Sequence, residues 1–200
     1  LEGIEGVGKS THLACVAERV RAAGLTVVVT REPGGVPLGE RIRDVLLAPG
    51  GRIPPLAELL LMLAARAAHL RVEADQVHGV AQDEAEEHDA SGGFGQQGRG
   101  LGDGPVGRLE ELVQGELRPD LTLVLDADWA VTRGRRERRG VTDRFEQEDE
   151  AFFARVRAAY LRRARAEPGR VRVVDASSPE ADVRARVAAL VDEYVSRILA

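Results

Sequence analysis

The stretch Gly3-Ile-Glu-Gly-Val-Gly-Lys-Ser10 limits what this chain can fold into more than any other part of the sequence. It matches the pattern G-x-x-x-x-G-K-[ST] and leads directly into a segment with helically spaced apolar residues: Leu13, Val16, Ala17 and Val20. Glycines let successive main-chain N–H groups turn inward around a phosphate, and the start of a helix adds partial positive charge. The pattern therefore predicts a phosphate-binding loop and a helix that ends near Gly24, against the alternative of a glycine-rich turn that only caps a helix.

Lys9 is the one lysine among the 28 basic residues of the chain. A compact ammonium reaches the β- and γ-phosphates of a nucleotide from a tight loop, where the rigid fork of arginine cannot replace it. The hydroxyl of Ser10 is placed to bind the Mg2+ that accompanies the phosphates. We therefore expect Lys9 to be catalytic and Ser10 to be the metal ligand. The full set expected to contact a triphosphate is Gly3, Ile4, Glu5, Gly6, Val7, Gly8, Lys9, Ser10 and Thr11.

Short apolar runs alternate with helical patterns along the rest of the chain. Strands are expected at Leu25–Val29 and Leu121–Leu125, both buried on two faces, and at Val171–Val174. Helices are expected over about 38–46, 109–117, 129–139 and 147–167, and from Pro55 and Pro179 onward. In the helix after Pro55, the expected buried side contains Leu60, Leu61, Leu63, Ala64 and Ala67. Strands alternating with helices predict an α/β fold with a mostly parallel sheet flanked by helices.

Length and composition narrow the class of protein. Two hundred residues suffice for one ordinary domain, so we expect a single domain over residues 1–200. No apolar run approaches the roughly 18 residues of a membrane span, and a lone Cys15 cannot form a disulfide framework, which favours a soluble protein of a reducing cytoplasm. A net charge of −5 and an aromatic content of 4% argue against nucleic-acid binding. The four histidines lack the spacing of a zinc site.

Two long motifs together resemble bacterial thymidylate kinase: Leu1–Thr11, and Thr30-Arg-Glu-Pro-Gly-Gly-Val-Pro-Leu-Gly-Glu-Arg-Ile-Arg43. Shorter matches follow in the family's order and spacing, at Leu61–Arg66, Gly98–Leu101, Arg118–Asp126 and Asp143–Glu146. The resemblance covers residues 1–70 and 98–200, and the TREPGG motif separates this family from other nucleoside monophosphate kinases. It implies a P-loop nucleoside monophosphate kinase fold with a helical lid over about 131–145, ATP and Mg2+ as cofactors, dTMP as the substrate and a homodimer.

The resemblance also implies roles on the acceptor side. Glu5 would reach the 3'-hydroxyl of dTMP, Arg43 would clamp its phosphate, and Arg66 would donate to the thymine carbonyl. Met62 stands where the family has an aromatic residue that stacks on the base. The residues alone leave plainer alternatives open: a solvated loop acid at Glu5, an exposed helix arginine at Arg43, the end of an apolar face at Arg66 and a core filler at Met62.

The basic cluster Arg133-Gly-Arg-Arg-Glu-Arg-Arg-Gly140 resembles the lid of the bacterial form, which supplies an arginine to the transferred phosphoryl group. Arg135 and Arg139 lie one helical turn apart and share a face, so either is a candidate catalytic residue. The other arginines of the cluster fit a solvated helix face. Asp175-Ala-Ser177 matches the family's loop near adenine.

The atypical acidic segment 71–98 departs from the family. Counting back from Gly98 places Ser91 in the substrate site, but Ala85-Glu-Glu87 stands where the family has Asp-Arg-aromatic. Glu86 would put a like charge beside the dTMP phosphate, with a repulsion of roughly 4 kcal/mol at about 4 Å and an effective dielectric of about 20. We expect a helix tail and then a loop here. Only Leu1 and Glu2 precede the first glycine, and the acidic segment has no apolar run able to form a buried strand, so we also expect two central strands to be missing.

Three explanations for this departure stay open: a frame-shifted stretch, a paralogue without kinase activity, or an alignment in which Asp83 or another acid takes over. The alternatives to a dTMP kinase are accordingly a catalytically impaired, nucleotide-binding relative and a P-loop kinase with a different acceptor.

Overall fold

The computed structural model describes residues 1–49, 52–76, 80–82, 99–101, 103–139, 145 and 148–200, with the backbone alone for 71–76, 80–82, 103 and 139. The described helices and strands are α1 (Lys9–Ala22), β1 (Val28–Thr30), α2 (Pro37–Leu47), α3 (Pro55–Gln76), β2 (Val80–Gln82), α5 (Asp103–Gln114), β3 (Thr122–Asp126), α6 (Trp129–Arg139), α7 (Glu150–Ala166), β4 (Val171–Asp175) and α8 (Glu180–Leu199).

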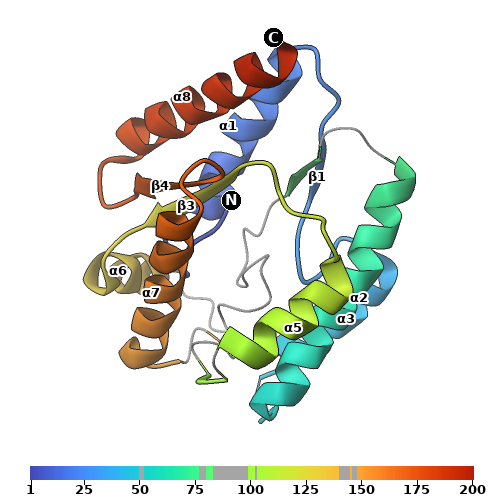
Figure 1. Ribbon diagram of the computed structural model, residues 1–200. Coiled ribbons are helices and arrows are strands. Elements are labelled where there is room, and N and C mark those ends of the chain that lie inside the picture. Colours follow the sequence, from blue (N-terminus) through green and yellow to red (C-terminus); the bar gives the residue numbers. More distant parts are fainter. Residues whose placement is uncertain (50–51, 77–79, 83–98, 102, 140–144, 146–147) are drawn as a thin grey trace.

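The parallel pair β3 and β4 forms the centre of one half of the molecule, in register from Thr122 opposite Val171 to Asp126 opposite Asp175. Helices α1 and α8 pack side by side on one side of this pair, and α7 covers the other (Figure 1). The chain passes from β3 to β4 through helices α6 and α7, because parallel strands need a crossover connection. The predicted α/β architecture with parallel strands is confirmed.

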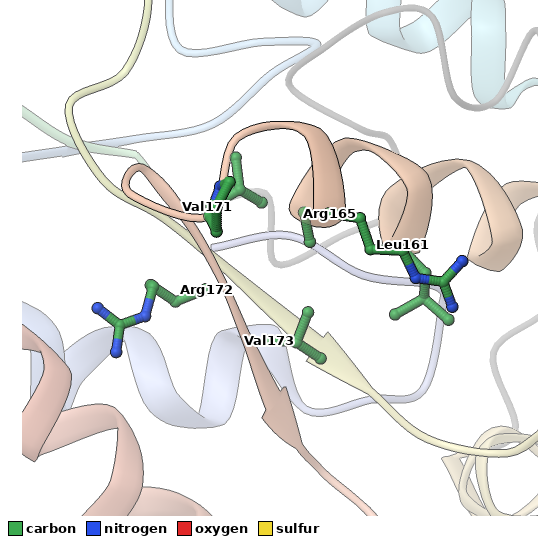
Figure 2. Close-up of a pocket in the computed structure, with 7 residues that line it drawn as sticks. Leu161, Arg165, Val171, Arg172 and Val173 are labelled. Atoms are coloured by element: carbon green, nitrogen blue, oxygen red, sulfur yellow. The ribbon is translucent and has the colours of Figure 1, made fainter.

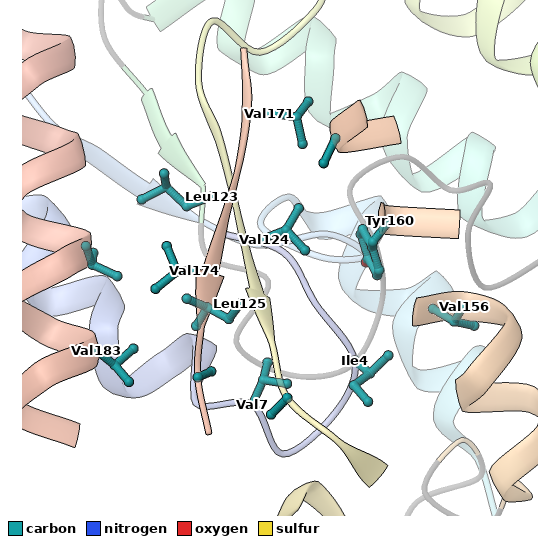
Figure 3. Packing of buried hydrophobic residues seen from close by; sticks show 14 of the residues in the cluster. Ile4, Val7, Leu123, Val124, Leu125, Val156, Tyr160, Val171, Val174 and Val183 are labelled. Atoms are coloured by element: carbon teal, nitrogen blue, oxygen red, sulfur yellow. The ribbon is translucent and has the colours of Figure 1, made fainter. Parts of the chain in front are cut away.

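The largest apolar core lies around β3 and β4. Leu123, Val124 and Leu125 of β3 are buried, in agreement with the expectation of a strand covered on both faces. Figure 3 shows Val183 of α8 reaching this pair from one side and Tyr160 of α7 from the other. The phosphate-loop side chains Ile4 and Val7 belong to the same cluster, so the loop is anchored by the core.

The other half of the molecule is built on α2, α3 and α5 (Figure 1). Helices α2 and α3 enclose a small apolar cluster that includes Ile42, Leu46 and Met62, and α3 and α5 enclose another around Leu59 and Val106. Beside them, β1 pairs in parallel with β2, from Val28 opposite Val80 to Thr30 opposite Gln82. None of the helices described here combines the length and apolar character needed to cross a membrane.

The expectation that two strands are missing was wrong for the acidic segment, while at the N-terminus the described residues form a single bridge and no strand. Val80–Gln82 forms β2, although the acidic segment around it offers too few apolar residues to reveal a strand. Glu2 makes a parallel bridge with Val124, donating its N–H to the oxygen of Leu123 at 2.8 Å and accepting from the N–H of Leu125 at 2.8 Å. Tyr160 donates its hydroxyl to the Glu2 side chain at 2.9 Å, which holds this residue in place.

Two other elements differ from expectation. Strand β1 is shorter than Leu25–Val29 and is not buried on both faces, because Val28 and Val29 are exposed on a strand whose described partner lies on one side only. Helix α5 begins at Asp103, six residues before the expected start at Leu109. The earlier start was missed because Gly104, Pro105 and Gly107 interrupt the helical pattern of apolar residues.

Helix α3 exposes part of the side that was expected to be buried. Leu63 is buried as predicted, but Leu60, Ala64 and Ala67 are exposed. The buried side instead includes three polar residues, Glu58, Arg66 and His69. The polar contacts of these residues set the rotation of the helix, because nearly every residue between them is apolar and periodicity cannot choose a face.

Candidate functional site

The phosphate loop passes close to the C-terminal end of β3 and to α6. Gly3, Gly6 and Gly8 all have positive φ angles, of 134°, 79° and 96°. A Cβ at Gly3 would collide with the main-chain oxygen of Leu125, and one at Gly6 would lie 2.7 Å from that of Thr132. Of the two fixed glycines of the motif, Gly3 is therefore required by both its conformation and the lack of space, whereas Gly8 is favoured by its positive φ angle alone.

Lys9 folds back over this loop. Its Nζ donates to the main-chain oxygen of Gly3 at 2.7 Å, and its side chain is buried. Ser10 and Thr11 follow with exposed side chains in the first turn of α1, which starts after Gly8 without a capping bond from any side chain in the described part of the chain. The first-turn amides, the ammonium and the two hydroxyls thus stand at one end of the helix, as a triphosphate site requires.

The side chains of Ile4, Glu5 and Val7 in the loop are all buried. Ile4 and Val7 pack into the main core, so their contribution to a phosphate is through the backbone. Glu5 is also buried, and a carboxylate among phosphate-binding amides is unfavourable unless it meets a donor. Its burial argues against the plain alternative of a solvated loop acid.

Helix α6 brings arginines to the loop. The guanidinium of Arg136 lies 4.3 Å from the ring centre of Trp129 and 4.5 Å from that of Phe153, and its Cγ would be 3.1 Å from a Cβ at Gly6. The structure therefore places Arg136, which was not singled out from the sequence, directly against the phosphate loop. Arg135 is half-buried on the same helix, while Arg139 ends it with a side chain outside the described part.

His12 is buried in the first turn of α1. Burial lowers its pKa, and Arg184 and Arg135 add to this effect while Glu180 opposes it. The charged groups that act on His12 thus come from the start of α8 and from α6. The loop before α8, which matches the family's loop near adenine, is ordered by Asp175, whose carboxylate accepts from the N–H of Ser177 at 2.9 Å.

The predicted acceptor residues Arg43 and Arg66 are both buried and both meet the segment Glu32-Pro33. Arg43 NH1 donates to the main-chain oxygen of Pro33 at 3.1 Å, and Arg66 Nε donates to Glu32 Oε2 at 2.6 Å. Arg43 is therefore not the exposed helix arginine of the plainer alternative, and Arg66 pairs with Glu32 instead of only ending an apolar face. Met62 lies in the apolar cluster between α2 and α3, which suits both a core filler and the wall of a pocket.

Some predicted features lie outside the described residues. These are Ser91, the segment Ala85–Glu87, and residues 140–144 of the expected lid. The residues that are described contain no group of three side chains able to hold a metal ion. The exposed hydroxyl of Ser10 beside the loop fits a Mg2+ that is bound mainly by phosphate oxygens and water.

Three polar contacts were missed from the sequence because they join distant segments. Arg157 of α7 binds Asp126 at the end of β3. Arg99, from the Gly-Arg-Gly motif, donates from Nε to the buried Glu58 at 3.0 Å and from NH1 to Glu148. The third is the Glu32–Arg66 pair. Only the Gly-Arg-Gly and TREPGG motifs signalled that Arg99 and Glu32 matter.

A pocket shown in Figure 2 lies away from these residues, between the end of α7 and β4. Its lining is Leu161, Ala164, Arg165, Pro168, Val171, Arg172 and Val173. It contains none of the predicted site residues.

Comparison with known proteins agrees with the geometry. The thymidylate kinase family model matches residues 1–187. Thymidylate kinases of Pseudomonas savastanoi pv. phaseolicola and Methylococcus capsulatus are each 48% identical to this chain, over 98% of its length and 94% and 95% of theirs. That of Pseudomonas fluorescens is 48% identical over 98% of this chain and 95% of its own. The phosphate loop is closed by Lys9, and two buried arginines from α2 and α3 contact the TREPGG segment. Together with the similarity along nearly the whole sequence, these features show that this chain belongs to the thymidylate kinase family.

Proposed function

We propose that this chain transfers the γ-phosphoryl group of ATP to dTMP, giving ADP and dTDP. A phosphate oxygen of dTMP attacks the γ-phosphorus, and the bond from that phosphorus to the β–γ bridging oxygen breaks. The observation that carries the proposal is the pairing of a complete phosphate loop with Arg43 and Arg66, two buried cations placed by a motif specific to this family.

On the donor side, the loop amides and Lys9 would hold the β- and γ-phosphates. Charge on the transferred group is spread over its oxygens in the transition state, so cations around it lower the barrier. Arg135 and Arg139 are the proposed contributors from α6, and Mg2+ bound with Ser10 would neutralise further charge. Arg136 supports this arrangement by packing α6 onto the loop at Gly6.

On the acceptor side, Arg43 would bind the phosphate of dTMP and Arg66 the thymine carbonyl. Glu5 would accept from the 3'-hydroxyl, Met62 would lie against the base, and Ser91 would complete the site. Two guanidiniums suit this substrate because one end is a dianion and the other carries carbonyl acceptors.

Steady-state formation of dTDP from ATP and dTMP tests the proposal, together with calorimetry of Mg-ATP and dTMP binding measured separately. Turnover with binding of both nucleotides is the expected result. The sequence Ala85-Glu-Glu87 favours one second candidate, an impaired nucleotide-binding protein. Binding of ATP without binding or turnover of dTMP would establish that candidate instead, and turnover of another monophosphate alone would indicate a different acceptor.

We also propose a homodimer, formed through α2 and α3. Each of these packed helices exposes apolar side chains at helical spacing: Leu38 and Val45 on α2, and Leu56 and Leu60 on α3. A second copy would bury them, since exposed apolar stripes of this kind are costly in water. Sedimentation should give a dimer for the natural chain and a monomer for Leu60→Glu, whereas a natural monomer would refute the interface.

The single, buried Cys15 suits the reducing cytoplasm in which we propose the chain works.

A further inference from the structure

We infer that Glu32 is a positioning residue that sets how the site reads the acceptor's base, through its hold on Arg66. Its Oε2 accepts from Arg66 Nε at 2.6 Å, and both side chains are almost fully buried, at 6% and 3% exposed. The inference rests on the proposed function, in which Arg66 contacts the base.

The type of contact fixes the direction of the arginine. A hydrogen bond from Nε holds the guanidinium at the end nearest the aliphatic part of the side chain, and both terminal NH2 groups are left to other partners. In a buried setting, rotation of Arg66 would separate two charges from each other and from water, which is strongly unfavourable. Glu32 therefore restricts Arg66 to one orientation before any substrate binds, and such preorganisation strengthens binding by removing an ordering cost.

The next residue along the chain holds the second acceptor arginine. The main-chain oxygen of Pro33 accepts from Arg43 NH1 at 3.1 Å. Two adjacent residues thus hold the proposed base-reading and phosphate-binding arginines, which come from different helices. Any shift of this segment would move both together, so the spacing between the two contacts is built into it.

The segment itself is firmly braced. Glu40 of α2 accepts from the N–H of Gly35 at 2.7 Å and from Arg31 NH2 at 2.9 Å. On the side of α3, Gly35 lies so close to His69 that a Cβ there would be 2.7 Å from the ring. The loop is therefore held by both helices, and the carboxylate of Glu32 has little freedom to follow a misplaced arginine.

The test compares Glu32→Gln with the natural chain. Glutamine keeps the size of the side chain but removes the charge that fixes Arg66. Affinities for dTMP and dCMP are measured by calorimetry, because cytosine carries an amino group where thymine has a carbonyl and a fixed guanidinium donor separates the two. We expect the ratio of dTMP to dCMP affinity to fall about tenfold, with the affinity for Mg-ATP unchanged.

Asp44→Asn is the matched control, since it removes an exposed acid from α2 and leaves the bonds from Glu40 to the loop in place. It should leave the ratio at its natural value even if the melting temperature falls. Glu32→Asp keeps the charge at a shorter reach and should give an intermediate ratio, and this variant decides the matter if Glu32→Gln fails to fold.

An unchanged ratio in the folded Glu32 variants, or equal weakening of both monophosphates and Mg-ATP, overturns the inference and assigns Glu32 a purely structural role. Failure of the natural chain to bind dTMP is a different result, since it refutes the proposed acceptor and the inference that depends on it.

Discussion

Arg157 donates hydrogen bonds to both carboxylate oxygens of Asp126: Nε lies 2.6 Å from Oδ1 and NH2 lies 2.8 Å from Oδ2. The third nitrogen, NH1, binds Asp128 at 2.6 Å. These contacts raise the pKa of the guanidinium, with the hydrogen bond to Asp126 as the main cause. Because Asp126 follows Leu125, the residue against which Gly3 packs, the pair ties α7 to the strand end that supports the phosphate loop.

Removal of this arginine should destabilise the fold. Arg157→Met would leave Asp126, which is 19% exposed, without its bidentate partner. We expect a loss of about 2 kcal/mol in the free energy of unfolding, the usual range for hydrogen bonds to a charged group. Urea denaturation measures it. Arg133→Met breaks an exposed pair with Glu137 and should leave the free energy of unfolding almost unchanged, because solvent screens exposed ion pairs. Equal losses in the two variants would contradict the special role of Arg157.

Substitution of Lys9 should affect nucleotide binding. Lys9→Ala removes the only ammonium at the loop, so we expect kcat to fall about 100-fold or more, together with the affinity for Mg-ATP. Arginine should not rescue it, because a planar fork does not fit the buried site. Arg19→Ala removes an exposed cation from the same helix and serves as the control. Unchanged ATP affinity in Lys9→Ala would remove the basis for the donor site.

Two glycine substitutions should shift stability in opposite directions. Gly3→Ala adds a Cβ at φ 134° where it collides with main-chain atoms of β3, so we expect a loss of about 2 kcal/mol or more. Gly107→Ala lies inside α5 with nothing within 4 Å of the added carbon and should gain about 0.5–1 kcal/mol. Thermal unfolding compares them. A stable Gly3→Ala chain would show that the loop can take another path.

Local signals predicted much of this molecule. The spacing from Leu13 to Val20 and the left-handed Gly24 gave the extent of α1, and the β-branched and apolar run at Leu121–Leu125 gave β3 as a buried strand. The Gly3–Ser10 pattern gave the loop whose geometry the structure shows. Each of these depends on residues close in sequence, so each can be recognised without the fold.

Contacts between distant residues could not be predicted in the same way. All seven residues from Leu59 to Ala65 are apolar, so the sequence offers no polar side by which to orient α3. Its rotation follows instead from Glu58 meeting Arg99 and Arg66 meeting Glu32, pairs that are 41 and 34 residues apart. Strand β2 was missed for a related reason, since three residues gain strand geometry only by pairing with β1.

The pH dependence of the free energy of unfolding should show that the buried carboxylate of Glu110 destabilises the fold. Burial raises its pKa above the ordinary value of 4.5, and Arg66, Arg163 and Arg118 oppose the rise without cancelling it. Arg163 NH2 lies 4.0 Å from Glu110 Oε2, which is too long for a strong hydrogen bond. The folded state therefore binds the proton more tightly than the unfolded state, and this residue's contribution to stability falls as the pH rises from 4.5 through the raised pKa.

Glu110→Gln mimics the protonated form at every pH. The variant should consequently be more stable than the natural chain at pH 7.5, and the difference should shrink as the pH is lowered towards 4.5, where the natural carboxyl takes up its proton. Urea unfolding at several pH values measures this difference. Glu111→Gln removes the same charge from an exposed position of α5 and should gain nothing at pH 7.5, because its carboxylate keeps its water. A gain for Glu110→Gln that is the same at both ends of this range would mean that side-chain size or hydrogen bonding, and not the buried charge, is responsible.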